Sequence, residues 1–191
     1  MKAHDMATGL AADAQQLNGA DDANPNQQLL AALRGIVDEA GLLLGEDVHS
    51  RHPGVFMSRI EAQVLVRPTT AEQVSRILAL CNEHGQSVVV QGGMSGWVRA
   101  TQTQPGDLVL SLERMNRIES VDTANRTAVV QAGVVLETLQ DHLQQFGLIF
   151  PLDLGGRGSC QLGGNAATNA GGVRVIRYGM MRQQVLGLEA V

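Results

Sequence analysis

Aromatic residues, cysteines and long apolar runs are all scarce in this sequence. Aromatic residues make up 3% of the 191 residues, so a core must be built from the aliphatic residues that bring the apolar fraction to 44%. Two cysteines without CxxC spacing argue against both a disulfide framework and a zinc ribbon. Because no apolar run approaches membrane-spanning length and no signal-peptide stretch opens the chain, we expect no membrane span and a cytoplasmic protein.

Positive charge is also in short supply, but it is unevenly distributed. Lysine and arginine number 14 against 19 acidic residues, a net charge of −5, so we expect no binding of nucleic acid. From 151 to 191 the balance is reversed, with Arg157, Arg174, Arg177 and Arg182 against Asp153 and Glu189. This local excess suits a cofactor diphosphate or an anionic substrate, which Arg174 or Arg177 would face. A solvated basic face is the alternative.

The chain divides into three segments. Residues 1–26 carry no apolar period and predict a disordered tail. Residues 27–61 predict a helix over 27–40, with apolar residues at helical spacing, and then a lead-in loop. His49 and His52 in that loop have no carboxylate or thiol at ligand spacing, so we expect no metal site. The remaining residues hold the glycine-rich motifs.

Residues 62–91 predict a β-α-β unit. A strand over 62–66 leads to a helix that begins at a capping box, formed by Thr70 with Gln73 or by Thr69 with Glu72. The apolar face of this helix is Val74, Ile77, Leu78 and Cys81, and Gly85 ends it. A strand over 87–91 should then run parallel to the first, with a right-handed crossover. Further strands at 107–111, 118–121 and 127–131 and a helix at 136–146 complete an α+β or mixed α/β pattern.

A first glycine loop follows the run Val88–Val90, which predicts a buried strand. The loop reads QGGMSG, and a buried strand that feeds a glycine turn can present successive amides to a pyrophosphate. It matches neither GxxxxGK[ST] nor GxGxxG, which argues against a P-loop nucleotidase and shows that the usual Rossmann fingerprint is missing. An ordinary hairpin turn is the alternative.

A second glycine segment, residues 159–178, reads SCQLGGNAATNAGGVRVIRY. Glycines at this density let a backbone approach a ligand closely, and the short amide and hydroxyl side chains add hydrogen-bonding groups. Such a surface suits a cofactor that carries phosphate. A glycine-rich connecting loop without function is the alternative.

The two glycine segments, with FPLDLGGRGSC before the second and RYGMMRQQVLGLEAV at the end, resemble the FAD-linked oxidases. The resemblance covers about residues 62–191 and is to the PCMH-type flavin domain of vanillyl-alcohol oxidase and p-cresol methylhydroxylase. Within that family, the branch of D-2-hydroxyglutarate and D-lactate dehydrogenases is most similar. It implies an α+β fold with a first subdomain around the β-α-β unit and the start of a second subdomain, incomplete at the C-terminus.

The resemblance also implies which residues hold FAD. The first loop would contribute Gln91, Gly92, Gly93, Met94, Ser95 and Gly96. The second segment and its approach would contribute Pro151, Leu154, Gly155, Ser159, Gly163, Gly164, Asn165, Thr168, Asn169, Gly171 and Gly172. Amides would bind phosphate, and hydroxyl or amide side chains would bind the ribityl chain and the ring.

Two departures from the family pattern bear on the cofactor. Where relatives with covalent flavin carry a histidine, this loop has Met94, which predicts non-covalent FAD. After Gly96 the chain reads Trp97-Val98-Arg99-Ala100, and these bulky residues are expected to tighten or displace the loop.

The implied activity is oxidation of a D-2-hydroxy acid to the 2-oxo acid, with hydride transfer to flavin N5 and a further electron acceptor. The family's substrate domain, with its catalytic histidines and metal site, is not found in the sequence, so we assign no catalytic residue. We therefore expect a truncated enzyme, inactive alone. The alternative is a non-catalytic remnant or a flavin module that binds a partner.

Overall fold

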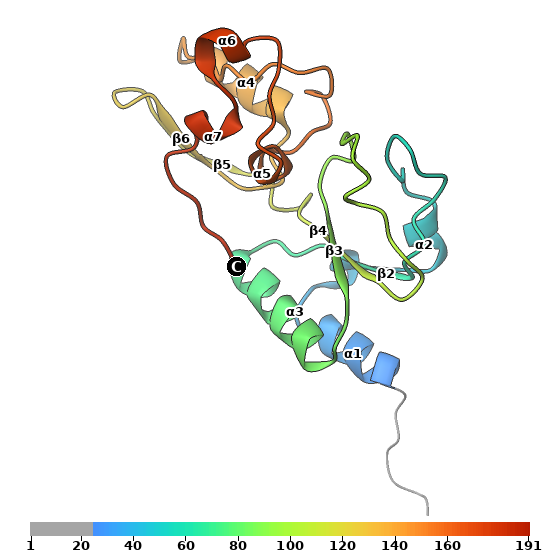
Figure 1. Ribbon diagram of the computed structural model, residues 1–191. Coiled ribbons are helices and arrows are strands. Elements are labelled where there is room, and N and C mark those ends of the chain that lie inside the picture. The colour runs from blue at the N-terminus through green and yellow to red at the C-terminus, as the bar shows by residue number, and fades with distance from the viewer. Residues whose placement is uncertain (1–24) are drawn as a thin grey trace, which may run out of the picture.

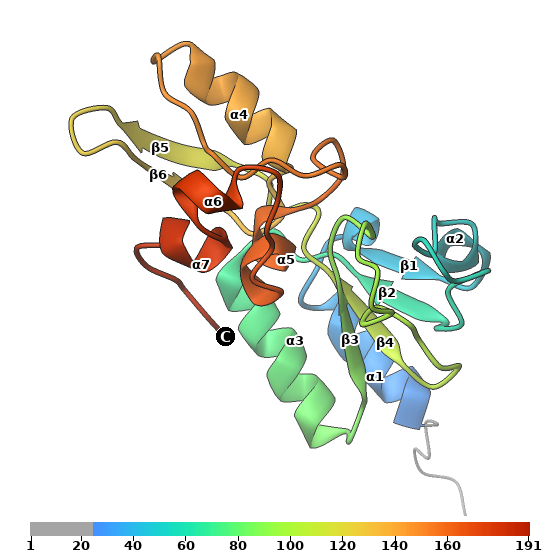
Figure 2. The same ribbon diagram turned by 45° about the horizontal axis from the view of Figure 1, so that its top comes forward.

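The computed structural model describes residues 25–191, so the tail expected over residues 1–26 lies largely outside the described part. Within that part the chain forms two lobes (Figure 1). The first lobe, residues 25–115, holds a four-stranded sheet, and the second lobe, residues 116–191, holds a two-stranded sheet and four short helices. In both views the second lobe lies beyond one end of the first sheet (Figures 1 and 2).

The first sheet has the strand order β1-β2-β4-β3. The strands are β1 (Leu42–Leu44), β2 (Val64–Val66), β3 (Val88–Gln91) and β4 (Leu108–Ser111). β1 is antiparallel to β2, whereas β4 is parallel to both β2 and β3. The segment expected to be only a helix and a lead-in loop therefore contributes an edge strand to the sheet.

The β-α-β unit forms, but its two strands are not neighbours. β2 and β3 run parallel, as expected, and β4 lies between them. β4 is buried at every position, whereas β3 lies at the sheet edge with Val90 54% exposed. The prediction of a buried strand before the first glycine loop is therefore wrong, because β4 takes the central place and leaves β3 at the edge.

Helices cover one face of this sheet. α1 (Pro25–Arg34) and α3 (Ala71–Glu83) lie side by side there (Figure 2). The core beneath them contains Leu29, Leu33, Val37, Val74, Ile77 and Cys81 against Val66, Leu108 and Leu110. The α3 face predicted from spacing is thus confirmed, with Leu78 partly buried beside it.

A second core lies on the other face of the sheet, formed by the residues of β2 and β4 whose side chains point away from α1 and α3. Leu65 and Val109 contact Val48 of α2 (Glu46–His49) together with Ile60 and Ala62. Because neighbouring strand residues point to opposite faces, β2 and β4 supply both cores.

The helix ends show which local predictions hold. Thr70 caps α3 by accepting a hydrogen bond from the Gln73 amide, while Gln73 Oε1 accepts from the Thr69 amide at 2.7 Å. Thr70 is therefore the cap, paired with Gln73, while the return bond of the Gln73 side chain goes to Thr69. Gly85 follows α3 with φ of 60°. α1 begins two residues earlier than predicted and ends at Arg34 instead of residue 40, because Gly35 disfavours continuing the helix.

The second lobe is built around α4 (Leu136–Gln144), whose buried face is Leu136, Leu139 and Leu143, as the spacing predicts. It packs near the hairpin of β5 (Ile118–Asp122) and β6 (Thr127–Val130) and three short helices. These helices are α5 (Leu162–Ala167), α6 (Val175–Tyr178) and α7 (Met181–Gln184). Between residues 25 and 191, no helix is both long enough and apolar enough to cross a bilayer.

Candidate functional site

The candidate site lies where the parallel strands of the first sheet end. The chain leaves β3 at Gly92 and β4 at Leu112, both at the carboxyl edge of the sheet. In open sheets with parallel strands, ligands bind outside this edge. The second lobe packs directly on it, because a Cβ on Gly133 would overlap the Leu112 carbonyl and lie 2.9 Å from the Met115 carbonyl oxygen. The seam between the lobes is therefore the candidate site.

The two glycine segments meet at this seam. A Cβ on Gly93 would overlap the Ser159 carbonyl and lie 2.8 Å from Cys160 Cα. A Cβ on Gly156 would lie 3.1 Å from Ser95 Cβ. The first loop and the approach to the second segment are thus in direct backbone contact.

The amides of the first loop are available as donors. Within residues 25–191, the N–H groups of Gly92, Gly93, Met94, Ser95 and Gly96 donate no hydrogen bond. Met94 bends the loop with φ of 54°, an uncommon conformation for a residue other than glycine. Successive free amides in a tight bend form a concavity suited to an anion. Gln91 itself is buried, and its Nε2 donates to the Thr101 carbonyl at 3.1 Å.

The residues after Gly96 do not close the site. Trp97 is 75% exposed and stacks edge-on against Phe56, with 5.8 Å between ring centroids. Its side chain therefore lies in solvent outside the seam. The exposed position of Trp97 gives no support to the expectation that bulky residues here tighten or displace the loop.

The middle of the second segment is a helix, where the sequence suggests a loop. α5 contains Gly163, Gly164 and Asn165, and the Gly163 amide donates to the Ala132 carbonyl at 2.7 Å. A Cβ on Gly163 would lie 2.7 Å from Ala132 Cβ, whereas one on Gly164 would meet nothing within 4 Å. Gly163 therefore permits close packing inside the protein, and Gly164 leaves open space at its surface.

Short polar side chains tie the second segment together. Asn165 is buried, and its Nδ2 donates to Cys160 Sγ at 3.4 Å. Thr168 Oγ1 donates to the Gly164 carbonyl at 2.8 Å, and Asn169 Oδ1 accepts from the Arg182 amide at 3.0 Å. These groups hold the segment in shape through contacts within the protein.

The remaining predicted residues lie around these segments. Gly171 packs against Val175 and Met180, and a Cβ on Gly172 would overlap the Asp153 carbonyl. Ser159 Oγ donates to the Gly156 carbonyl at 3.3 Å. Pro151 is buried, and Leu154 and Gly155 line a hollow together with Asp153, Arg157 and Val173.

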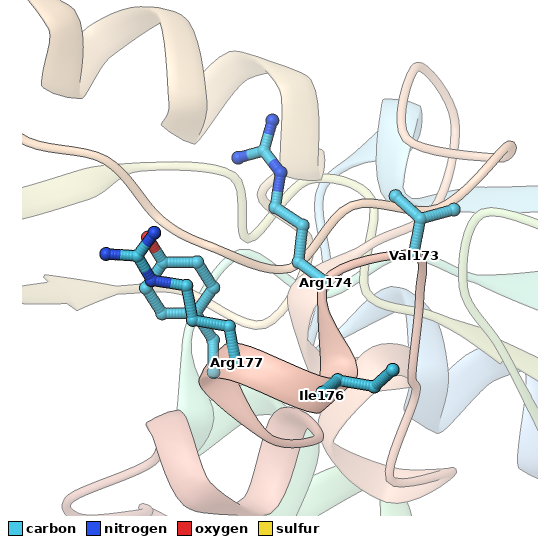
Figure 3. Close-up of a pocket in the computed structure, with 5 residues that line it drawn as sticks. Val173, Arg174, Ile176 and Arg177 are labelled. Atoms are coloured by element: carbon cyan, nitrogen blue, oxygen red, sulfur yellow. The ribbon is translucent and has the colours of Figure 1, made fainter.

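The arginines of the second lobe are partly neutralised. Arg174 Nε lies 3.2 Å from Asp153 Oδ2, and Arg157 pairs with both Asp153 and Glu137. The Arg177 guanidinium lies 5.2 Å from the centre of the Tyr178 ring. Figure 3 shows both Arg174 and Arg177 rising from the α6 region, where they line a second hollow with Val173, Ile176 and Tyr178. Arg177 forms no ion pair among the residues described, so it is the freer of the two candidates for an anion.

Nucleophilic and metal chemistry have little basis in the described residues. Burial raises the pKa of the Cys160 thiol, an effect that the Asn165 hydrogen bond partly opposes, and burial also raises the pKa of the Cys81 thiol. Across residues 25–191, no three His, Cys, Asp or Glu side chains gather as a metal site. His52 Nδ1 accepts from the Gly54 amide at 3.1 Å.

One residue of the site is missed by the sequence motifs. Gln161 is 8% exposed, and its Oε1 is buried without a hydrogen-bond partner, 3.4 Å from where a Cβ on Gly92 would lie. A glutamine inside a glycine-rich segment gives no pattern of its own, so only the fold reveals it.

Comparisons with known proteins agree with this geometry. Residues 62–191 match the protein family described as FAD binding domain. A mitochondrial D-2-hydroxyglutarate dehydrogenase of Bos taurus is 42% identical over 165 residues, which cover 85% of this chain and 30% of that protein. A Schizosaccharomyces pombe protein with the provisional name of a mitochondrial D-lactate dehydrogenase is 44% identical over 133 residues, or 70% of this chain and 25% of that one.

A solved structure shows the same fold. The structure of p-cresol methylhydroxylase superposes with a TM-score of 0.63 at 22% identity, over 77% of this chain and 30% of that chain. The expected PCMH-type α+β fold is thereby confirmed. The expected cytoplasmic location is wrong by the same comparisons, since both relatives are named as mitochondrial.

Proposed function

Since this chain belongs to the FAD binding domain family, we propose that it forms the FAD-binding part of a flavin-dependent dehydrogenase that oxidises a D-2-hydroxy acid to the 2-oxo acid. The names of the bovine and yeast relatives support this substrate class. The chain spans about 30% of the length of the bovine relative, so the proposal concerns the part that these residues play in the oxidation.

One observation carries the proposal: the two glycine segments meet at the carboxyl edge of the parallel strands, with a row of free amides between them. FAD requires donors for its diphosphate and acceptors for its hydroxyl and N–H groups. The amides of Gly92–Gly96 supply the donors, and the buried Gln161 Oε1 is an unused acceptor beside them. The residues present therefore fit the cofactor.

We assign the predicted residues two kinds of role in holding FAD. The amides of the first loop bind the diphosphate, and Gly164 leaves clearance for the ligand. Gly93, Gly163 and Gly172 act indirectly, because each lets one backbone segment of the protein approach another. The thioether of Met94 replaces the histidine used for covalent attachment, so FAD is held without a covalent bond.

When bound, FAD supplies an acceptor at N5 for the hydride that leaves the substrate carbon, and a separate electron acceptor reoxidises it. This chain's residues bind and orient the cofactor and exclude water along the seam. Arg177, which is partly free beside the second hollow, offers positive charge to a carboxylate. We place no general base among residues 25–191.

A binding titration tests the proposal. The purified chain should quench the fluorescence of added FAD, and acid precipitation should release the colour into the supernatant. Gly164→Val should weaken FAD binding at least about tenfold with little change in Tm, because its side chain enters open space that the ligand needs.

Gly187→Val is the matched control, because Gly187 also has nothing within 4 Å but lies on the segment that follows α7. This variant should bind FAD like the wild type. Failure of the wild-type chain to bind FAD would contradict the proposal, and unchanged binding by Gly164→Val would contradict the assignment of that surface. A chain that binds FAD but restores no oxidation when combined with the rest of a relative would favour the non-catalytic module.

A further inference from the structure

We propose that the Gln161 side chain binds FAD directly, with Oε1 accepting a hydrogen bond from a hydroxyl or N–H group of the cofactor. This inference rests on the proposed FAD-binding function and adds a residue that distinguishes the donor-bearing parts of FAD from its phosphates.

The backbone at Gln161 is firmly placed. Gln161 forms an isolated antiparallel bridge with Val135, and its carbonyl accepts from the Asn165 amide at 2.9 Å. It precedes α5 as the N-cap residue, yet its side chain makes no capping hydrogen bond. The side chain is instead directed toward Gly92 in the first loop. The contacts with Val135 and Asn165 therefore fix the backbone of Gln161, and its side chain lies against the first loop.

Two glutamines are buried in the described part of the chain, Gln91 and Gln161, and only Gln161 has a buried side-chain atom without a hydrogen-bond partner. Gln91 Nε2 donates to the Thr101 carbonyl at 3.1 Å. Gln161 is more than nine-tenths buried, and Oε1 has no partner within the described residues. A buried acceptor without a donor is costly for a protein, so its retention beside the free amides of the loop indicates a ligand that completes it.

The chemistry of the oxygen limits what that ligand group can be. An amide oxygen is an acceptor only, so it cannot pair with the phosphate oxygens that the neighbouring amides would bind. In FAD, donors occur on the ribityl chain and the isoalloxazine ring, and also on the ribose and adenine. Gln161 therefore recognises one of these groups.

Gln161→Met tests this pairing, because it keeps the length of the side chain and removes its polar atoms. In the protein without FAD, Tm should rise by about 2–4 °C, since an unpaired buried group is removed. The dissociation constant for FAD should increase about three- to tenfold, since the cofactor loses an acceptor. A residue with a merely structural role would not give these opposite effects. Gln161→Leu should behave in the same way if methionine packs poorly.

Gln86→Met is the matched control at the other end of β3. Gln86 Nε2 donates to the carbonyls of Ser87 and Gly106, so its replacement should lower Tm and leave FAD affinity unchanged. Titrations with FMN and ADP locate the donor. Loss of affinity for FMN places it on the flavin half, and loss for ADP places it on the adenosine half.

The two proposals fail in different ways. If wild-type protein binds FAD and Gln161→Met binds it within twofold of wild type, the role of Gln161 is wrong and the proposed function stands. If the variant is destabilised like the control, Oε1 is paired within the protein and the inference is also wrong. If wild-type protein binds neither FAD nor FMN, the proposed function itself fails.

Discussion

At the residue scale, the glycines of the site differ in what surrounds them. Gly93 and Gly172 each lie against a backbone carbonyl of another segment, and Gly163 lies against Ala132. Gly96 and Gly164 have nothing within 4 Å of an added Cβ. The first group is required for the protein to close on itself, and the second leaves room at the surface. A sequence motif that lists only glycines does not distinguish these two groups.

Gly93→Ala should therefore destabilise the protein more than the addition of a single methyl group suggests. The added methyl would overlap the Ser159 carbonyl, and relieving that overlap should lower the free energy of unfolding by about 1–3 kcal/mol. Urea denaturation measures this loss. Gly96→Ala is the control and should change stability by less than about 0.5 kcal/mol, because its Cβ enters open space. Equal stability of the two variants would show that the segments do not touch at Gly93.

The two cysteines should be unreactive in the folded protein. Cys81 and Cys160 are both buried, and burial raises the pKa of each thiol above its ordinary value. Because the thiolate is the reactive form, iodoacetamide at pH 8 should label neither residue until urea unfolds the chain. Mass spectrometry of the labelled protein reads this directly. Rapid labelling of Cys160 in the native state would mean that the second segment opens readily.

At the element scale, paired charges join segments of the first lobe that also share its hydrophobic core. Asp38, between α1 and β1, forms a two-bond ion pair with Arg114, which follows β4, at 2.6 and 2.7 Å. Arg51 and Arg67 both pair with Glu113 beside it. These groups surround the carboxyl edge of the sheet, where the site is formed.

The Asp38–Arg114 pair should contribute to acid sensitivity. The Arg114 guanidinium holds the pKa of Asp38 below its ordinary value of about 3.9. The stabilisation is present above the pKa of the unfolded chain and is lost as pH falls through the lower folded pKa. Asp38→Asn should therefore make Tm less dependent on pH below the ordinary aspartate pKa of about 3.9. Thermal scans at pH 7 and pH 3 measure the difference, and Asp141→Asn, on the exposed side of α4, is the control.

At the scale of the whole molecule, the site belongs to neither lobe alone. The first lobe supplies the loop after β3, and the second supplies the segment from Gly156 to Gly164, with Gly133 packed against the end of β4. A ligand bound at this seam contacts both lobes. Its binding should therefore stabilise them together.

FAD should raise the thermal stability of the chain in a single transition. At a free concentration 100 times Kd, a ligand that binds only the folded state adds about 2.7 kcal/mol, which corresponds to an increase of about 5–10 °C in Tm for a domain of this size. Differential scanning calorimetry with and without FAD measures the shift. Riboflavin, a flavin that has no phosphate, serves as the comparison ligand. Two transitions of which FAD shifts only one would indicate that FAD contacts one lobe only.

Much of the local structure follows from the sequence. The α3 face of Val74, Ile77 and Cys81 repeats at helical spacing, Thr70 caps the helix, and Gly85 ends it. The QGGMSG and LGGN motifs identify both glycine segments and the family. Periodicity, caps and glycine placement act over a few residues, so they can be read without the fold.

The strand order and the contents of the site were decided by the tertiary structure. β4 separates β2 from β3 and is buried at all four positions, an outcome that depends on how distant segments pack. The contact of Gly93 with Ser159 and the unpaired oxygen of Gln161 also join residues far apart in the chain. Local patterns identify the glycines, but only the packing of distant segments determines which of them lie against protein backbone and which face open space.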